Sequence, residues 1–440
     1  MVEGTKDPMS VYHHLRERYP GECFLLESVE GPRKTSRYSF IGADPLSTFK
    51  ATGSKVEIDG EMVDSESSFE LLRAHFHSLR CGSMDLAPFS GGLVGYVGYG
   101  MTSQFEGVLS KECSSSDLHF ILARHLVCID HLNSRTYLIS HGDIGELRRE
   151  FEMVRSRPRT KIAIEDRGSN IDRERYERMV ASAKENILDG DVFQIVLSRK
   201  VLFDLYGDPL ELYSVLREMN PSPYMYLLDF GEERIIGSSP EMLVRLEGDK
   251  LTTRPLAGTR PRHSDPEEDE KLKMDMLLDE KERAEHLMLV DLHRNDMGKV
   301  SKPGTVKVTE LMNVEKFSHV QHIVSNIESV LDEKKDAFDA LKACFPAGTV
   351  TGAPKVRAME LIAEYEDDAR GPYAGAVGYF DFNGNMDFAI TIRSIMVHGH
   401  HATLQAGAGI VHDSVPANEF TETQHKMGAL LMALMTKEVE

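Results

Sequence analysis

Residues 405–426 read QAGAGIVHDSVPANEFTETQHK and combine a strand, a turn and the beginning of a helix. The small apolar start is typical of a strand and turn whose backbone approaches a ligand closely. Pro416 suits the first turn of a helix and so marks where that helix begins. Glu419, Glu422 and Lys426 follow at spacings of three and four residues. The stretch therefore predicts a helix that presents two carboxylates and an amine on one face.

A second pair of carboxylates occurs earlier in the chain. Glu282 and Glu285 are also three residues apart, in the run KERAEHLMLVD at 281–291. Carboxylate oxygens without an accompanying Cys or His pattern suit Mg²⁺, so two such helices facing each other would form a magnesium site. Spacing alone favours the alternative of solvent-exposed ion pairs, and it does not show that the helices meet.

Three further segments hold candidate binding residues. The run GTVTGAPK at Gly348–Lys355 resembles a phosphate loop, but it lacks the Gly-Lys-Ser/Thr order, which excludes a nucleotide P-loop. Backbone N–H groups at such a helix start can still bind a carboxylate. Arg393 lies among apolar residues, so its charge needs an anionic partner. His322, taken alone, is more often explained as a core histidine.

Composition narrows the class of protein. The chain of 440 residues has 71 acidic and 51 basic residues and a net charge of -20. Nucleic acid and anionic membranes are therefore not expected as partners. No apolar run is long enough for a transmembrane helix and the N-terminus does not resemble a signal peptide, so we expect a soluble protein. The five scattered cysteines predict reduced thiols and a cytoplasmic location.

The order of the predicted elements is irregular. Residues 1–155 indicate strands and turns with one helix at 67–80, residues 156–172 are polar and predict a linker, and 173–437 mix helices and strands. The predicted helices are 176–187, 209–219, 266–293, 336–344, 354–365 and 416–436, and the predicted strands include 23–26, 38–41, 91–99, 193–201, 224–229, 241–246, 374–380, 387–397 and 402–406. The absence of a regular βαβ alternation argues against a doubly wound sheet.

Five motifs carry a family resemblance. They are GSSPE at 237–241, RPLAGTR at 254–260, the block 282–296, the loop 348–355 and the stretch 407–426. In this order, and over nearly the whole chain, they resemble the chorismate-binding enzymes, which include anthranilate, aminodeoxychorismate, isochorismate and salicylate synthases. The resemblance implies an α/β (α+β) fold with two packed β-sheets in a sandwich core flanked by helices, four layers in all. It also implies that the N-terminal and chorismate-binding regions are interleaved in one body.

The resemblance implies a magnesium site. Glu285 and Glu422 match the Mg²⁺ ligands, and Glu282 and Glu419 match supporting groups. Bound Mg²⁺ would hold the ring carboxylate of chorismate and withdraw electron density from the ring.

The resemblance also implies roles in catalysis and binding. Glu241 matches the general acid that protonates the departing C4 hydroxyl, and His322 matches a histidine needed for a later elimination. Thr349 and Gln194 complete the expected catalytic set. The groups implied to hold chorismate are Gly258, Thr259, Tyr373, Arg393, Gly407, Ala408, Gly409 and Lys426.

Two positions favour one branch of the family. Ala257 stands where aminodeoxychorismate synthases commonly carry a nucleophilic lysine, and alanine cannot form a covalent adduct. Gln194 stands where isochorismate and salicylate synthases carry a lysine base, and glutamine fits ammonia, which needs no activation. We therefore expect amination of chorismate at C2 and loss of pyruvate to give anthranilate, the first committed step of tryptophan biosynthesis. Aminodeoxychorismate or aminodeoxyisochorismate synthase is the alternative.

Expected partners follow from the same resemblance. The runs 25–28 and 220–226 resemble the L-tryptophan pocket of feedback-inhibited anthranilate synthases, with Ser28, Arg37, Pro223, Tyr224 and Met225 as the tryptophan-binding residues. Few residues follow Lys426 and no Cys sits in a nucleophile elbow. A separate glutamine amidotransferase subunit is therefore expected to supply ammonia, in a heterotetramer of two large and two small subunits.

Overall fold

The computed structural model describes residues 1–440 except 30–36, 80–85, 110, 318–319 and 436–440. Its helices are α1 (Pro8–Arg18), α2 (Ser68–Ser78), α3 (Thr102–Phe105), α4 (Ile144–Met153), α5 (Arg173–Leu188), α6 (Pro209–Met219), α7 (Pro266–Leu278), α8 (Glu280–Gly298), α9 (Ala337–Cys344), α10 (Lys355–Tyr365) and α11 (Pro416–Met435), with the 3₁₀ turns η1 (Tyr99–Met101) and η2 (Gly348–Val350).

The strands are β1 (Val2–Glu3), β2 (Cys23–Glu27), β3 (Tyr38–Thr52), β4 (Lys55–Ile58), β5 (Glu61–Asp64), β6 (Gly92–Val97), β7 (Leu118–Asp130), β8 (Arg135–Ser140), β9 (Ala163–Ser169), β10 (Gln194–Tyr206), β11 (Tyr224–Phe230), β12 (Glu233–Ser239), β13 (Met242–Glu247), β14 (Lys250–Thr253), β15 (Leu256–Pro261), β16 (Lys307–Lys316), β17 (Val320–Val330), β18 (Gly352–Ala353), β19 (Ala376–Asp381), β20 (Met386–Ile390), β21 (Ser394–His398) and β22 (His401–Ile410).

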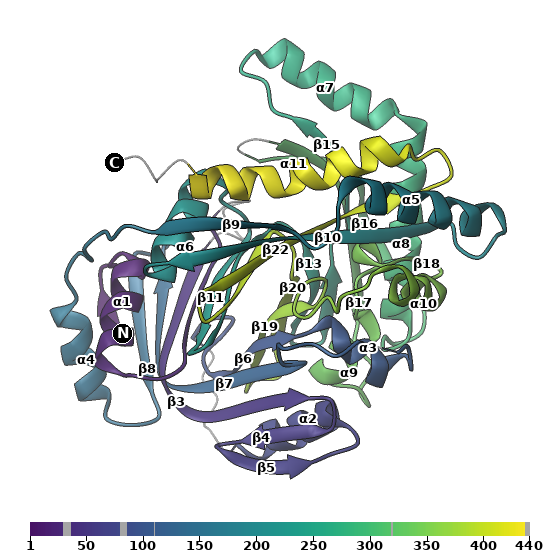
Figure 1. The fold of residues 1–440 in the computed structure, drawn as a ribbon. Helices are drawn as coiled ribbons and strands as arrows, with labels where there is room; N and C mark the ends of the chain where they lie inside the picture. Colours follow the sequence, from purple (N-terminus) through teal and green to yellow (C-terminus); the bar gives the residue numbers. More distant parts are fainter. Residues whose placement is uncertain (30–36, 80–85, 110, 318–319, 436–440) are drawn as a thin grey trace.

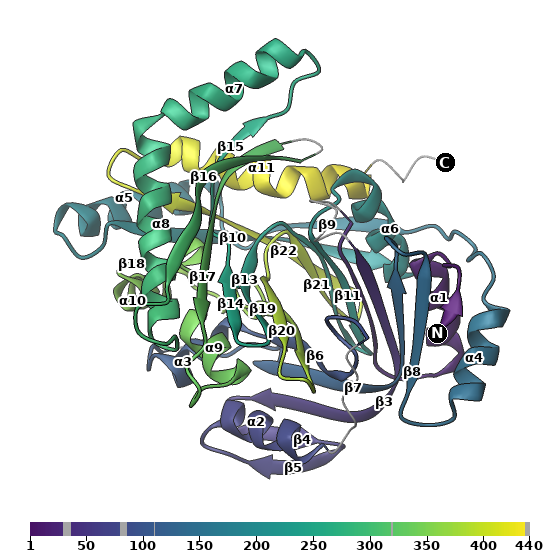
Figure 2. The ribbon, with the colours of Figure 1, turned by 180° about the vertical axis from the view of Figure 1, so that it is seen from behind.

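Antiparallel pairing links these strands into two faces. One side runs from β9 through β10, β22, β21, β12, β11 and β2 to β3. The other side runs from β7 through β6, β19, β20, β13 and β14 to β17. The long strands β3 and β7 pair with each other and join the two sides, because β3 also pairs with β2 of the first side and β7 with β6 of the second. The chain thus forms two sheets joined by two bent strands (Figure 1 and Figure 2).

In the described part of the chain, four apolar clusters hold the layers together, one of which packs α5 and α10 against β10 and β22. A second lies between the sheets and includes Phe24, Tyr226 and Ile121. A third packs α1, α4 and α6 on the outside of the first sheet, and the fourth packs α2, α8 and α9 on the outside of the second. This confirms the predicted architecture of two packed sheets flanked by helices, because each element buries its apolar face against a neighbouring layer.

Two predicted elements were wrong in detail. The helix predicted at 266–293 is two helices, because Asp279 caps α8 by accepting hydrogen bonds from the amides of Lys281 (3.0 Å) and Glu282 (3.2 Å). The strand predicted at 387–397 is divided between β20 and β21. Arg393 lies in this break with a φ of 49°, a left-handed conformation that does not continue a strand. The other predicted helices agree with α2, α5, α6, α9, α10 and α11, whereas α1, α3 and α4 were not predicted in the region 1–155.

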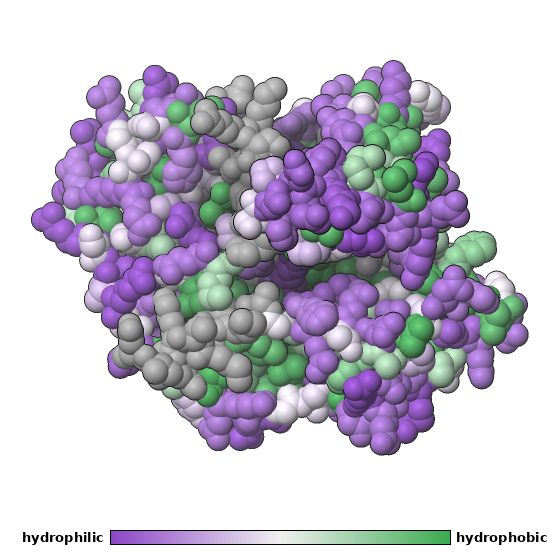
Figure 3. Space-filling model, turned by 90° about the horizontal axis from the view of Figure 1, so that it is seen from above, coloured by the Kyte–Doolittle hydropathy of each residue, from purple (hydrophilic) through white to green (hydrophobic). Residues whose placement is uncertain are grey.

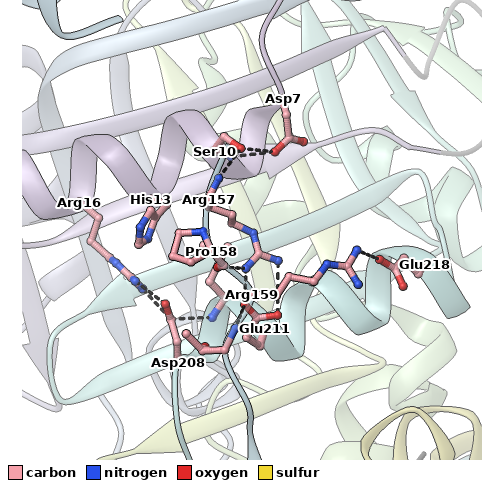
Figure 4. Close-up of polar contacts among 12 residues, drawn as sticks. Asp7, Ser10, His13, Arg16, Arg157, Pro158, Arg159, Asp208, Glu211 and Glu218 are labelled. Atoms are coloured by element: carbon pink, nitrogen blue, oxygen red, sulfur yellow. Dashed lines mark hydrogen bonds and ion pairs between the residues drawn. The ribbon is translucent and has the colours of Figure 1, made fainter. Parts of the chain in front are cut away.

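The segment predicted as a linker contains ordered structure. Its residues 163–169 form β9, which pairs with β10. Before it, Arg157 forms a buried ion pair with Glu211 of α6, and its amide donates to the Ser10 hydroxyl of α1 (3.3 Å). Figure 4 shows these contacts beside the Arg16–Asp208 ion pair (2.6 Å). The division of the chain at 156–172 stays a prediction, and strands from both sides of it are interleaved, as in the pairs β2–β11 and β6–β19.

The surface is largely hydrophilic, in agreement with the content of charged residues. Figure 3, which views the molecule from above, shows a mainly hydrophilic face with scattered hydrophobic residues. Within the part of the chain that the structure describes, no helix is long and apolar enough to cross a membrane. Of the cysteines, Cys23, Cys113, Cys128 and Cys344 are free thiols, and Cys81 lies outside the described residues.

Candidate active site

The pairing of β10 with β22 forms one wall of the site. Gly407, Ala408 and Gly409 lie opposite Ser198, Leu197 and Val196. A Cβ atom on Gly407 would lie 2.9 Å from the carbonyl oxygen of Leu197 and 3.1 Å from the Tyr373 hydroxyl. Glycine is therefore needed here because the Leu197 carbonyl and the Tyr373 hydroxyl both lie close to the strand backbone. The structure thus brings Tyr373 to the predicted Gly-Ala-Gly run.

Gln194 begins β10 and lies against the same run. A Cβ atom on Gly409 would lie 2.5 Å from the Gln194 Nε2 atom, so the amide occupies the space that the glycine leaves open. Among the described residues, the buried Oε1 atom of Gln194 has no hydrogen-bond partner. A buried acceptor without a partner is costly unless a ligand or water satisfies it.

Glu241 is a buried carboxyl immediately before β13. Burial raises its pKa to about 7, and the Thr349 hydroxyl, the Leu256 backbone and the cations Arg393 and Lys426 oppose that rise. Its Oε1 atom and the Thr349 hydroxyl have no hydrogen-bond partner with good geometry in the described part of the protein. A carboxyl with this pKa is largely protonated at slightly acidic pH and can donate a proton near neutrality.

His322 lies on β17 next to the glycine-containing strand β15. Its Nδ1 atom is 2.9 Å from the Gly258 carbonyl and 3.1 Å from the Thr259 hydroxyl. Because a carbonyl only accepts, Nδ1 carries the proton and Nε2 keeps its lone pair. Burial lowers the pKa of His322 to about 4, and Nε2 has no partner among the described residues. The ring is therefore a neutral imidazole with an unused basic nitrogen.

Arg393 supplies positive charge to this region. Its backbone carbonyl accepts from the Ser238 amide (3.1 Å), which fixes the strained residue beside β12. Burial lowers its pKa, and Glu241 opposes this. No described acidic side chain forms an ion pair with the guanidinium, so it has the capacity to bind an anion. Arg393 and Lys426 both affect the pKa of Glu241 and of His322, which shows that these groups share one region.

The two acidic pairs lie near each other. The pKa of Glu285 is raised to about 7, first by burial and then by Glu282, Glu422 and Glu419, while Lys281 opposes the rise. Burial also raises the pKa of Glu419. Three cations partly offset this repulsion through the ion pairs Lys281–Glu285 (3.8 Å), Lys426–Glu422 (2.7 Å) and Arg260–Glu282 (3.0 Å).

An oxygen-only donor set with this mutual repulsion fits a hard cation such as Mg²⁺. The four carboxylates do not, however, form a closely spaced ligand group here. Within the described ranges, one group of three possible ligands has donor atoms within 4.8 Å of one another, and it consists of Asp204, His400 and His401. Lys426 also donates to the Gly407 carbonyl (2.9 Å), which ties α11 to β22.

Sequence reasoning missed a buried ion pair behind the site. Arg370 donates to Glu366 and to the carbonyl oxygens of Val350 (2.7 Å) and Val196 (2.8 Å). Glu366 in turn accepts from the amide and hydroxyl of Ser198, both at 2.8 Å. The guanidinium also lies over the rings of Tyr99 and Tyr373. A glutamate and an arginine four residues apart are usually a surface pair, so their spacing gave no signal.

The predicted tryptophan-binding residues separate into two groups. Ser28, Pro223 and Tyr224 line a small cavity that is partly open to solvent and is also lined by Arg254 and Phe317. Met225 is buried in the core cluster beneath α6, and Arg37 pairs with Asp130 (2.6 Å). Neither of these two residues lines the cavity, so their assignment stays a prediction.

Comparison with known proteins gives the class. The sequence profile of the family described as chorismate binding enzyme matches residues 21–432. The chain therefore belongs to the chorismate-binding enzymes.

Individual relatives narrow the similarity within that family. The chain is 44% identical over 438 residues to anthranilate synthase component 1 of Methanothermobacter thermautotrophicus, covering 98% of this chain and 92% of the relative. The crystal structure of anthranilate synthase component I from Streptococcus pneumoniae superposes with a TM-score of 0.82 at 36% identity, covering 91% and 93% of the two chains. The menaquinone-specific isochorismate synthase of Escherichia coli, at 20% identity and a TM-score of 0.76 over 98% and 92%, shares the fold alone.

Proposed function

We propose that this enzyme converts chorismate and ammonia to anthranilate and pyruvate, in the biosynthesis of tryptophan. The observation that carries the proposal is the pairing of an acid with a base in one region. Glu241 has a pKa near 7, while neutral His322 keeps a free Nε2 lone pair. The names of relatives at 41–45% identity support the same reaction.

The substrate is proposed to be held by its charges. Arg393 and Tyr373, with the backbone amides of Gly407–Gly409, would bind the enolpyruvyl carboxylate, because a planar guanidinium suits a planar carboxylate. Gly258, Thr259 and Thr349 would line the ring. Glu285 and Glu422, supported by Glu282 and Glu419, would hold Mg²⁺ at the ring carboxylate. When bound, Mg²⁺ would supply Lewis-acid polarisation of that carboxylate.

The first proposed step is amination. Ammonia adds at C2, the ring double bonds shift, and the C4–O bond breaks. Glu241 donates its proton to the departing hydroxyl, which leaves as water. Gln194 suits this step because ammonia already carries its lone pair and needs no base, and the amide can accept a hydrogen bond from it.

The second proposed step is elimination. The Nε2 atom of His322 removes the C2 proton, the C3–O bond breaks, and the enolpyruvate takes up a proton to become pyruvate. The ring becomes aromatic, which drives the step. Ala257 argues against aminodeoxychorismate synthase activity, because the alanine side chain provides no nucleophile. Aminodeoxyisochorismate synthase would stop before elimination.

Partners and regulation belong to the same proposal. The name "component 1" of the relatives supports a second component. We propose that this partner is a glutamine amidotransferase subunit that delivers ammonia, in a heterotetramer of two large and two small subunits in the cytoplasm. We further propose L-tryptophan as a feedback inhibitor bound at Ser28, Pro223 and Tyr224, the predicted residues that line the cavity.

The test is an assay of the chain with chorismate, Mg²⁺ and ammonium salt. Anthranilate fluorescence is expected, whereas accumulation of a non-aromatic aminated product would favour the aminodeoxyisochorismate alternative. Glu422→Gln is expected to lower turnover at least about a hundredfold at fixed Mg²⁺. Glu177→Gln is the matched control, because Glu177 also forms an i,i+4 ion pair, with Arg173 at 2.6 Å. Equal turnover in the two variants would refute the metal assignment.

A further inference from the structure

Three possible metal ligands meet at the end of the sheet that carries the Gly-Ala-Gly run. Asp204 on β10 lies directly opposite His401 on β22, and His400 stands in the turn that connects β21 to β22. One donor atom from each residue lies within 4.8 Å of the other two. The strands β9, β10 and β22 run side by side in Figure 1, so this cluster has a rigid base.

Local contacts hold each member of the cluster in place. The Nδ1 atom of His401 is 2.7 Å from Asp204 Oδ1. His400 is fixed through its backbone, because its carbonyl accepts from the Leu205 amide (2.8 Å), and its ring stacks on Tyr206 with 5.8 Å between centroids. The two imidazole rings lie 4.1 Å apart. Preorganised ligands lose little freedom on binding a metal.

Burial and charge distinguish the cluster from an ordinary surface pair. The Asp204 side chain is 4% exposed, while that of His401 is 64% exposed. Hydrogen bonding from His401 lowers the pKa of Asp204, so its carboxylate is charged. Among the described residues, the one arginine or lysine paired with Asp204 is the exposed Arg167, at 3.5 Å. A buried carboxylate beneath two accessible imidazoles offers one oxygen and two nitrogen donors to a cation arriving from solvent.

We propose that Asp204, His400 and His401 form a binding site for Zn²⁺ or a similar borderline transition metal. Zinc takes imidazole nitrogen and carboxylate oxygen at about 2.0–2.2 Å in tetrahedral sites, and sites with three protein ligands leave a fourth position to water. Donor atoms around one zinc ion are then roughly 3.3–3.5 Å apart, so small side-chain rotations complete the site. The nitrogen donors separate it from the oxygen-only set proposed for Mg²⁺.

The site is separate from the proposed active site. His401 is the first residue of β22, and Gly407 is six residues further along the same strand, or about 20 Å at 3.3 Å per residue. A bound ion would clamp the edge formed by β10 and β22. The cluster therefore does not depend on the proposed reaction, and its test uses metal binding as the readout.

The experiment is a calorimetric Zn²⁺ titration of the full chain in excess Mg²⁺, with Co²⁺ absorption as a second readout. Wild-type protein is expected to bind one Zn²⁺ at this site and to give a tetrahedral Co²⁺ spectrum. His400→Gln and His401→Gln are expected to weaken Zn²⁺ binding at least about tenfold and to abolish that spectrum. Arg167→Gln is expected to tighten binding, because it removes a competing cation from Asp204.

His412→Gln is the matched control. His412 also contacts an aspartate, Asp413 at 2.8 Å, and is comparably exposed, but it belongs to no group of three ligands in the described chain. Its Zn²⁺ affinity should equal that of the wild type. Wild-type protein that binds no Zn²⁺, or equal affinity in the wild type and in both His400→Gln and His401→Gln, would overturn the proposal. Because the two histidines are exposed, replacing them should preserve the fold. Circular dichroism of each variant checks this.

Discussion

At the scale of single residues, the raised pKa that lets Glu241 donate a proton near neutral pH also lowers the stability of the folded protein. Burial raises its pKa from 4.5 to about 7. Between these values the unfolded chain has lost the proton while the folded protein keeps it, so stability falls as pH rises through this window. Above about pH 7 the folded protein bears the full penalty of a buried charge, at about 1.4 kcal/mol for each unit of pKa shift.

We predict that Glu241→Gln lowers turnover by about 10²–10⁴-fold, because the general acid is lost. The same variant should raise the melting temperature of the metal-free protein at pH 8 and change it little at pH 4. Wild-type activity should also decline above about pH 7, as Glu241 loses its proton. Thermal melts at the two pH values and a pH–rate profile check this; a stability gain that is the same at both pH values would contradict the pKa argument.

A substitution at Gly409 tests whether the position of the Gln194 side chain matters for turnover. A methyl group on Gly409 would meet only the far end of the Gln194 side chain, at 2.5 Å from Nε2. We therefore predict that Gly409→Ala displaces the amide and lowers turnover at least about tenfold, while the melting temperature changes little. Gly428→Ala is the control, since a Cβ there meets nothing within 4 Å. A large loss of stability in Gly409→Ala would show that the strand backbone, not the amide, had moved.

At the scale of elements, the Arg370–Glu366 pair connects separate parts of the chain. It joins the carbonyls of β10 and η2 to the end of α10 and lies over the ring of Tyr373. Both side chains are almost fully buried. Breaking one partner of a buried pair leaves an uncompensated charge, which costs about 3–5 kcal/mol.

We predict that Arg370→Lys keeps the charge but loses the two carbonyl contacts, so that the protein is destabilised by about 2–4 kcal/mol. KM for chorismate should also rise, because Thr349 and Tyr373 lose their support. Denaturant unfolding and steady-state kinetics measure the two effects. The exposed Arg178 on α5 provides the control, and Arg178→Lys should change stability by less than about 0.5 kcal/mol. Destabilisation without any change in KM would show that Arg370 stabilises the fold but does not position the substrate-binding residues.

At the scale of the whole molecule, the cavity beside Ser28 adjoins the proposed active site. Pro240, which precedes Glu241, lines the cavity, and so does Phe317, which packs edge-on against His322 at 5.7 Å between ring centroids. A ligand in the cavity would therefore contact residues that adjoin both the acid, Glu241, and the base, His322. This supports control of the reaction from that cavity.

We predict that Ser28→Phe abolishes inhibition by L-tryptophan while turnover stays within about threefold of the wild type, because the added ring fills the cavity and not the active site. Inhibition curves with and without tryptophan measure this. Ser54→Phe, at an exposed turn, is the control and should leave inhibition intact. Inhibition of the Ser28 variant at wild-type tryptophan concentrations would refute the role of this cavity.

The sequence by itself determined the family, most helices and the identity of the candidate residues, because motif order and the spacing of apolar side chains are local properties. Ala257 and Gln194 can likewise be interpreted without coordinates, since each stands where another branch of the family carries a lysine. Only the tertiary structure decided which residues meet. The repulsion that raises the pKa of Glu285 requires α8 and α11 to approach each other, and the free Nε2 of His322 follows from the carbonyl of Gly258 on a neighbouring strand. Arg370, Glu366 and the Asp204–His400–His401 cluster were invisible in the sequence for the same reason: burial and long-range pairing, not spacing along the chain, give these side chains their chemistry.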